Sequence, residues 1–371
     1  MSLLLGFLCL LISGLVKSIS YDEFVQQCQE KYQIRGALAK YIEWHQSNTD
    51  FPIMTYDINR GFGMGSDIHQ WSEKLCYALE NGYRLRTVGN SWQWADQENC
   101  KDTLNLACYT KNKNILYNEN IANNRIALTV QSNETSYFKC RGDFKKLVSR
   151  MIVQKIKKYP DMLDTTSFIR AASIEYLFGG DGSNGLSDVL LKQMYAQIQK
   201  VFKKPDIPSN LINVHIRWGD KKREMKLHNV EEYIDAVNDM IKIKNIVNLN
   251  KTTENNIYVS SDDTNAITSF KNEAPKNWNI FTDPIIDTIL NIDSSKDPNA
   301  QNPYWFAHQT QGKMGLISLS SLLIACESNY HVLTTGSNWS RLMNEVRKNI
   351  NDKHCNGCTY MIDLEYGEYR R

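Results

Sequence analysis

A dense group of charged side chains follows a short apolar stretch in the second half of the chain. The apolar stretch covers residues 211–216, and the loop after it contains Arg217, Asp220, Lys221, Lys222, Arg223, Glu224 and His228. Cations suit a phosphate-bearing ligand, because arginine offers planar bidentate donors and lysine a compact point charge. A carboxylate among them can accept a proton from an attacking hydroxyl group. The alternative is a solvated loop with surface ion pairs, and the charges alone do not decide between the two.

The neighbouring sequence indicates how these side chains are positioned. Residues 211–216 are predicted to form a buried strand, and a helix is predicted to begin near Asn229. Open α/β sheets bind ligands at the carboxyl ends of their strands. The charged loop lies at such an end, which favours a ligand site there.

A second candidate site follows an earlier predicted strand. The order is a strand over residues 53–58, the glycines Gly61, Gly63 and Gly65, a helix over 67–80 and a strand over 83–88. Glycines allow close backbone approach and unusual dihedral angles, and a helix N-terminus attracts anions. Ser66 or Asp67 is predicted to cap the helix. The spacing differs from the dinucleotide-binding fingerprint, so a tight turn that only joins strand to helix is the alternative.

The remaining pattern predicts two lobes. Helices are expected over residues 21–50, 144–157, 167–178 and 190–202, and residues 89–140 are expected to be rich in loops, with a strand at 126–130. The prolines at 205 and 208 mark the predicted boundary between lobes. Beyond it, strands at 211–216, 256–261, 278–281 and 330–334 alternate with helices at 230–244, 264–272, within 305–326 and after 338, with a polar flap at 283–303. This alternation is typical of a parallel sheet.

The N-terminal residues and the cysteines together predict the cellular compartment of the protein. Residues 3–16 form an apolar run, which is shorter than the roughly 20 residues of a membrane span. Residues 1–20 are therefore predicted to be a signal peptide cleaved after Ser20, with an uncleaved signal anchor as the alternative. The eight cysteines beyond residue 20 suggest disulfides of the secretory pathway, in the Golgi lumen or secreted. Cys355 and Cys358 have CxxC spacing, for which we favour a disulfide over a zinc or redox site.

Composition excludes some classes of partner. The chain has 371 residues and a formal net charge of +2, which gives no basis for general binding to nucleic acid or to a membrane surface. We expect membrane contact only through a possible N-terminal anchor. Three sequons occur, at Asn133, Asn250 and Asn338.

Four segments together resemble one known family. HIRWGDKKREMKLHNVEEY, from His215 onward, resembles the HxR…DK…E…H…EEY signature of the GDP-fucose-dependent α1,6-fucosyltransferases that core-fucosylate N-glycans. INRGFGMGSDIHQ is similar to that family's first glycine-rich motif, VSSDDTNAI to its strand-DD-helix segment, and TTGSNWSRLMNEV to its last strand-to-helix motif. The four occur in the family's order and are spread over about residues 28–350.

The resemblance implies an α/β, GT-B-like fold with two Rossmann-like lobes, each a parallel sheet flanked by helices. The expected N-terminal lobe covers residues 21–204 with a helical insert, and the donor-binding lobe covers 205–371. The implied activity is an inverting, metal-independent transfer of fucose from GDP-fucose to a glycan or glycoprotein acceptor. No cofactor and no metal site are expected.

The roles implied by the resemblance fall on named residues. Arg217 and Lys221 would neutralise the departing diphosphate, Glu224 would be the base, and Asp220 would replace Glu224 or orient Arg217. The donor would be bound by Gly61, Gly63, Gly65, His215, Arg217, Ser337 and Asn338. A donor-binding Asn338 lies in a cleft, whereas a glycosylated Asn338 lies on the surface, and we predict the cleft.

Three departures from the family pattern are visible. Trp218 stands where the family has a second arginine, and the spacing from Lys221 to Glu224 is one residue shorter. Serines and a leucine occupy residues 319–321, where the family has an acidic residue. An inactive relative that binds glycan or nucleotide sugar is therefore the alternative function.

Overall fold

The structure is a computed structural model. It describes residues 35–58, 61–101, 103–117, 126–130, 140–155, 165–179, 185–208, 210–218, 225–247, 254–290, 303–347, 359–365 and 368–370. The predicted signal segment, the sequons at Asn133 and Asn250, and the Cys355–Cys358 pair lie outside these ranges. Among the described residues, no helix has both the length and the hydropathy to cross a membrane.

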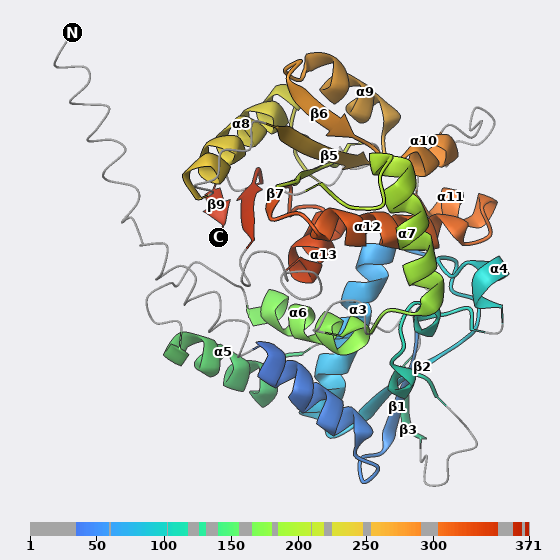
Figure 1. Ribbon diagram of the computed structural model, residues 1–371. Helices are drawn as coiled ribbons and strands as arrows, with labels where there is room; N and C mark the ends of the chain where they lie inside the picture. Colours follow the sequence, from blue (N-terminus) through green and yellow to red (C-terminus); the bar gives the residue numbers. More distant parts are fainter. Residues whose placement is uncertain are drawn as a thin grey trace.

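The N-terminal lobe is built on a small parallel sheet (Figure 1). Strand β1 (Ile53–Asp57) pairs with β2 (Arg84–Val88) and with β3 (Ile126–Val130), both in parallel. Helix α3 (Met64–Glu80) joins β1 to β2. The predicted βαβ unit is therefore confirmed, with the helix beginning three residues earlier than expected.

Further helices pack around this lobe. A helix over residues 35–47, α5 (Asp143–Lys155) and α6 (Thr165–Phe178) lie beside α3 in Figure 1. The expected loop-rich region contains only β3 and three short helices, α4 (Gln97–Cys100), η1 (Leu106–Cys108) and η2 (Lys113–Ile115). Helix α7 (Asp188–Phe202) then leads toward the second sheet.

The C-terminal lobe contains a six-stranded sheet in the order β6-β5-β4-β7-β8-β9. Its strands are β4 (Ile212–Ile216), β5 (Asn255–Ser261), β6 (Trp278–Phe281), β7 (Tyr330–Leu333), β8 (Tyr360–Asp363) and β9 (Glu368–Arg370). All pairs are parallel except β8 with β9. The strand order reverses between β4 and β7, and ligands of doubly wound sheets bind at such a switch point.

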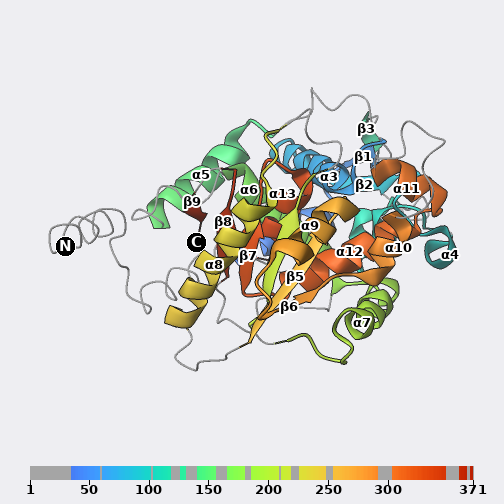
Figure 2. The same ribbon diagram turned by 90° about the horizontal axis from the view of Figure 1, so that it is seen from above.

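Helices cover both faces of this sheet. The side chains of Ile212, Val214 and Ile216 pack in the cluster that contains residues of α8 (Val230–Val247) and α9 (Thr264–Glu273); Figure 2 shows these helices from above. Strand side chains alternate between faces, so Asn213 and His215 point the other way. There lie α12 (Lys313–Cys326) and α13 (Asn338–Val346), between the two sheets in Figure 1. The predicted α/β fold with two lobes is confirmed.

The polar segment after β6 differs from its prediction. Residues 284–290 form helix α10 (Pro284–Leu290) rather than a flap, because Asp283 caps the helix by accepting a hydrogen bond from the Ile285 amide at 2.9 Å. Helix α11 (Pro303–Gln309) is separated from α12 by Gly312, whose φ of +82° lies in the left-handed region. Strands β8 and β9 were not predicted.

Two disulfides occur in the described chain, Cys76–Cys140 and Cys100–Cys108. Cys326 is a buried free thiol, and burial raises its pKa. The prediction of disulfides is therefore confirmed, while Cys326 packs as a small apolar side chain.

Candidate active site

A cavity of about 420 Å³ lies between the two lobes. All seven residues predicted to bind the donor line it: Gly61, Gly63, Gly65, His215, Arg217, Ser337 and Asn338. They come from the loop after β1, the first turn of α3, the end of β4 and the start of α13. The fold therefore brings together segments that are far apart in the sequence.

The glycine loop opens the N-terminus of α3 toward the cavity. Gly61 has a φ of +71°, a conformation that L side chains rarely adopt. Gly63 is the N-cap residue, and no described side chain caps the helix. The prediction that Ser66 or Asp67 caps it is wrong, because Asp67 is buried and accepts a hydrogen bond from Trp92 Nε1 at 3.0 Å. No described side chain therefore blocks the N-terminus of α3 from binding an anion.

Gly65 allows α3 to pack closely on α13. A Cβ atom at Gly65 would lie 3.1 Å from the carbonyl oxygen of Asn338. We expect Gly65→Ala to lower the free energy of unfolding by about 1–3 kcal/mol, because backbone must move to accommodate the methyl group. Gly63→Ala is the matched control, since no described atom lies within 4 Å of its Cβ position. Equal urea midpoints for the two variants would contradict this prediction.

Arg217 lies at the carboxyl end of β4 and is held in place there. Its guanidinium forms a salt bridge with Asp262 and donates to the Trp218 carbonyl oxygen at 3.1 Å. Asp262 follows β5 and also lines the cavity. Its Oδ1 atom is buried and has no hydrogen-bond partner among the described residues.

Sequence reasoning missed the role of Asp262. In the sequence the Asp-Asp pair after β5 stands out only as part of a family motif, and Asp220 is the carboxylate predicted to orient Arg217. In the structure Asp262 is the carboxylate paired with Arg217. The signal that could have found it is its place at the carboxyl end of the strand next to β4.

His215 reaches the cavity from β4 and is buried. Its Nδ1 atom lies 2.7 Å from the Ser340 hydroxyl of α13. Burial lowers the pKa of His215 to about 3, and the charge of Arg217 also lowers it. The imidazole is therefore neutral near pH 7, and it can form hydrogen bonds with a ligand without adding charge.

A pH dependence of stability follows from this buried histidine. The folded pKa of about 3 lies below the value of about 6.5 in an unfolded chain. Below about pH 6.5 the unfolded state binds a proton that the folded state does not, so stability falls as the pH falls toward 3, by up to about 1.4 kcal/mol per pH unit. Urea unfolding at several pH values should show this, with a shallower slope for His215→Gln. An unchanged slope in that variant would contradict the assignment.

Ser337 and Asn338 begin helix α13. Ser337 is the N-cap residue and its side chain accepts a hydrogen bond from the Trp339 amide at 3.3 Å. Asn338 is half-buried at the cavity wall, and Ser340, the third sequon residue, is fully buried. We therefore expect peptide mass spectrometry of the folded protein to find Asn338 without a glycan. An occupied glycan there would contradict the cavity assignment.

The remaining predicted positions do not line the cavity in the described structure. Three of them lie outside the described ranges: Asp220, Lys221 and Glu224. Trp218 packs against the α8 side of the sheet, and its Nε1 atom donates to the His228 carbonyl oxygen at 2.8 Å. Among residues 319–321, where an acidic residue was expected, Ser321 of α12 lines the cavity, and Ser318 of the same helix lines it as well.

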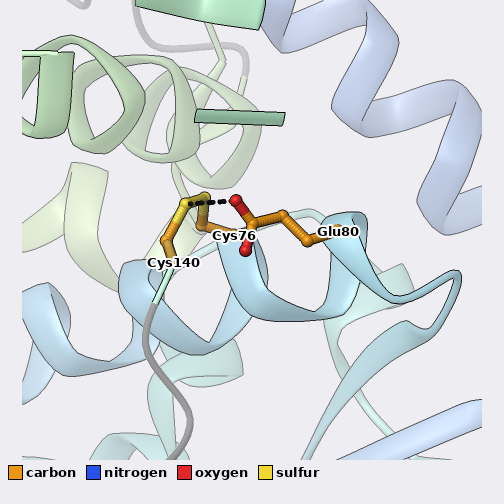
Figure 3. Close-up of side chains that lie close together, drawn as sticks. All are labelled: Cys76, Glu80 and Cys140. Atoms are coloured by element: carbon orange, nitrogen blue, oxygen red, sulfur yellow. Dashed lines mark hydrogen bonds between the residues drawn. A yellow bond between two sulfur atoms is a disulfide. The ribbon is translucent and has the colours of Figure 1, made fainter. Parts of the chain in front are cut away.

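One group of three described residues has the spacing of metal ligands: Cys76, Glu80 and Cys140 (Figure 3). The two sulfur atoms are joined in a disulfide, whereas metals bind thiolates. The Glu80 carboxylate accepts hydrogen bonds from the Gly142 and Lys145 amides at 2.8 and 3.3 Å, so it caps α5. This group therefore has a structural role, because the disulfide and the Glu80 carboxylate connect α3 to the start of α5.

The comparison with protein families finds a match that covers most of the C-terminal lobe. The family model of alpha-(1,6)-fucosyltransferase N- and catalytic domains matches residues 187–354. The match covers 168 of the 371 residues. The predicted family resemblance is confirmed over this part of the chain, which is thus a glycosyltransferase. The matched segment includes His215, Arg217, Ser337 and Asn338, whereas the glycine loop lies before it.

Solved structures of fucosyltransferases also superpose on the chain. NodZ alpha-1,6-fucosyltransferase soaked with GDP-fucose gives a TM-score of 0.39 at 12% identity, covering 85% of this chain and 98% of that one. NodZ from Bradyrhizobium gives 0.40 at 11%, covering 85% and 96%. POFUT1 in complex with GDP gives 0.36 at 10%, covering 86% and 100%. No curated protein matches, and the assignment of the catalytic domain rests on the family match.

Proposed function

We propose that this fucosyltransferase uses GDP-fucose and transfers the sugar to a glycan hydroxyl, in α1,6 linkage to the innermost GlcNAc of N-glycans. The observation that carries the proposal is the convergence on one cavity of Arg217 with the N-termini of α3 and α13. These groups supply one positive charge and the positive ends of two helix dipoles. A diphosphate is the ligand group that such a set would stabilise.

The same groups support the chemistry of the transfer. As the bond from fucose to GDP breaks, negative charge grows on the diphosphate, and fixed donors stabilise that charge. Two groups provide further hydrogen-bonding positions for the nucleoside or sugar. They are the neutral His215 imidazole, whose Nδ1 atom contacts Ser340, and the Asp262 Oδ1 atom, which has no partner among the described residues. We propose inversion at the fucose carbon without a metal, with Glu224 as the base that takes the acceptor proton.

The test is GDP release from GDP-fucose by the purified protein with a panel of acceptors. The panel contains an N-glycan, a chitin oligosaccharide, a free oligosaccharide without a chitin core and a protein acceptor. We expect release with the N-glycan, an α1,6 linkage in the product by NMR, and an undiminished rate in EDTA. Release only with another acceptor would contradict the linkage, and loss of activity in EDTA would contradict the metal-independent mechanism.

A second candidate is an inactive relative that binds nucleotide sugar. Trp218 in place of a second arginine and the serines of α12 in place of an acid favour it. GDP binding without release from GDP-fucose in any acceptor mixture would support this candidate. The location in the secretory pathway stays a prediction.

A further inference from the structure

His69 of α3 connects the N-terminal lobe to the first two turns of α13. Its ring is buried, with an exposed fraction of 3%. Nε2 lies 2.8 Å from Glu345 Oε2, and Nδ1 lies 3.4 Å from Asn338 Oδ1. Both ring nitrogens therefore face the same helix. Neither His69 nor Glu345 lines the cavity, but Asn338 does.

These contacts determine how the Asn338 amide is turned. Arg341 Nη2 contacts the Asn338 side chain, and a guanidinium can only donate hydrogen bonds. The atom that faces Arg341 must therefore be the carbonyl oxygen. His69 Nδ1 contacts the same oxygen and so acts as a second donor. With its oxygen fixed by two donors, Asn338 has its nitrogen, Nδ2, on the opposite side of the amide.

The Nδ2 group is then available to a ligand. No acceptor among the described residues contacts it, and Asn338 is the first residue of α13 at the wall of the cavity. An amide nitrogen carries two hydrogen-bond donors. Placed beside the N-terminus of α3, which no described side chain caps, these donors suit an oxygen of the diphosphate.

Glu345 keeps the His69 ring in the required orientation. Its side chain is 1% exposed, its Oε2 atom lies within hydrogen-bond distance of His69 Nε2, and its Oε1 atom has no partner among the described residues. A buried carboxylate with one partner depends strongly on that partner. Rotation of the ring away from Asn338 would leave the carboxylate unpaired, so the pair holds Nδ1 toward Asn338.

We propose that His69, anchored by Glu345, is a positioning residue that aims the Asn338 amide donors at the diphosphate of the donor substrate. The inference rests on the proposed function, because it assigns a role within the same site. It also explains why the glycine loop and the donor lobe must pack closely: the residue that aims a C-terminal donor group belongs to the N-terminal lobe. The competing interpretation is that the pair only joins the lobes.

A double-mutant cycle with GDP as the probe separates the two interpretations. Calorimetric titration gives the GDP dissociation constant for the native protein, His69→Gln, Asn338→Ala and the double variant. Glutamine places its amide near the position of Nε2, so His69→Gln keeps a donor for Glu345 and loses the one for Asn338. We expect about a tenfold weaker affinity, or about 1.4 kcal/mol, in the native background. In the Asn338→Ala background we expect less than about a twofold change.

Two further variants serve as controls. Asparagine places its amide near the position of Nδ1, so His69→Asn is expected to bind GDP within about threefold of the native protein despite lower stability. His45→Gln removes a buried histidine of the helix over residues 35–47 and should leave GDP affinity unchanged. Thermal melts report whether each variant folds.

The possible outcomes are distinct. Equal losses from His69→Gln in both backgrounds, or no loss in either, would overturn the positioning role. If His69→Gln fails to fold, a tenfold loss in folded His69→Asn would overturn it as well, and near-native affinity would support it. Absence of GDP binding by the native protein, or GDP binding unaffected by Arg217→Ala, would overturn the proposed function and this inference with it.

Discussion

Arg217→Ala is expected to lower the rate of GDP release from GDP-fucose about 10²–10³-fold, equivalent to a loss of roughly 2.7–4 kcal/mol of transition-state stabilisation. Arg217 is the cation that the described chain places in the cavity, at the end of β4 and only 7% exposed. Its salt bridge with Asp262 fixes the guanidinium before the donor binds. A fixed charge needs no reorganisation when negative charge develops on the diphosphate. The measurement is kcat with a saturating acceptor.

Two variants control for charge and for orientation. Arg217→Lys keeps the positive charge but loses the planar pair of donors, so we expect an intermediate rate. Asp262→Asn keeps a hydrogen-bond acceptor for Arg217 while removing the opposite charge, and should raise KM for the donor more than it lowers kcat. Turnover by Arg217→Ala at the native rate would show that the diphosphate lies elsewhere.

The fold was predictable where the hydrophobic pattern is strongly periodic. Strand β4 alternates the apolar Ile212, Val214 and Ile216 with Asn213 and His215, and it is buried along its length as predicted. The predicted start of α9 at residue 264 is also found, and Asp263 caps the helix there by accepting a hydrogen bond from the Asn265 amide at 2.8 Å. Local chemistry and tertiary packing agree at these elements.

Prediction failed where tertiary contacts override local signals. Asp67 has the chemistry of an N-cap residue, but its carboxylate is buried against Trp92, and α3 starts earlier at an uncapped glycine. Residues 284–290 belong to the segment predicted as a polar flap, yet they form a helix, and Ile286 and Ile289 are buried in the core. Whether such a residue caps a helix or packs in the core depends on where other segments of the chain lie. A single sequence does not give those positions.

The site was predictable in its residue types but not in its pairings. The sequence pointed to Arg217 and to the histidine two residues before it, because strand-end cations and family motifs mark them. It did not indicate that Asp262 pairs with Arg217, that Ser340 holds His215, or that Glu345 holds His69. These partners are between 45 and 276 residues apart in the chain. Spacing along the sequence carries no information about such contacts.

Glu224→Gln is expected to reduce kcat by about 10²–10⁴-fold while leaving GDP affinity nearly unchanged. Glu224 lies seven residues beyond Arg217 in the charged loop, outside the described ranges. If it takes the acceptor proton, an amide of the same shape removes that ability, and general base catalysis contributes a factor of this size. Binding of the donor does not require the base. The combination of lost turnover with retained GDP binding therefore differs from the effect of Arg217→Ala, which should weaken both.

Variants of neighbouring acidic residues test whether the reduction of kcat is specific to Glu224. Glu231, an exposed residue in the first turn of α8, is the matched control, and Glu231→Gln should turn over at the native rate. Asp220→Asn tests the other candidate base in the same loop. If Asp220→Asn loses the activity and Glu224→Gln keeps it, Asp220 is the base and Glu224 belongs to the surface of the loop. If both keep it, the proton acceptor must come from outside this loop, and the free oxygen of Asp262 at the cavity wall becomes the carboxylate to replace next.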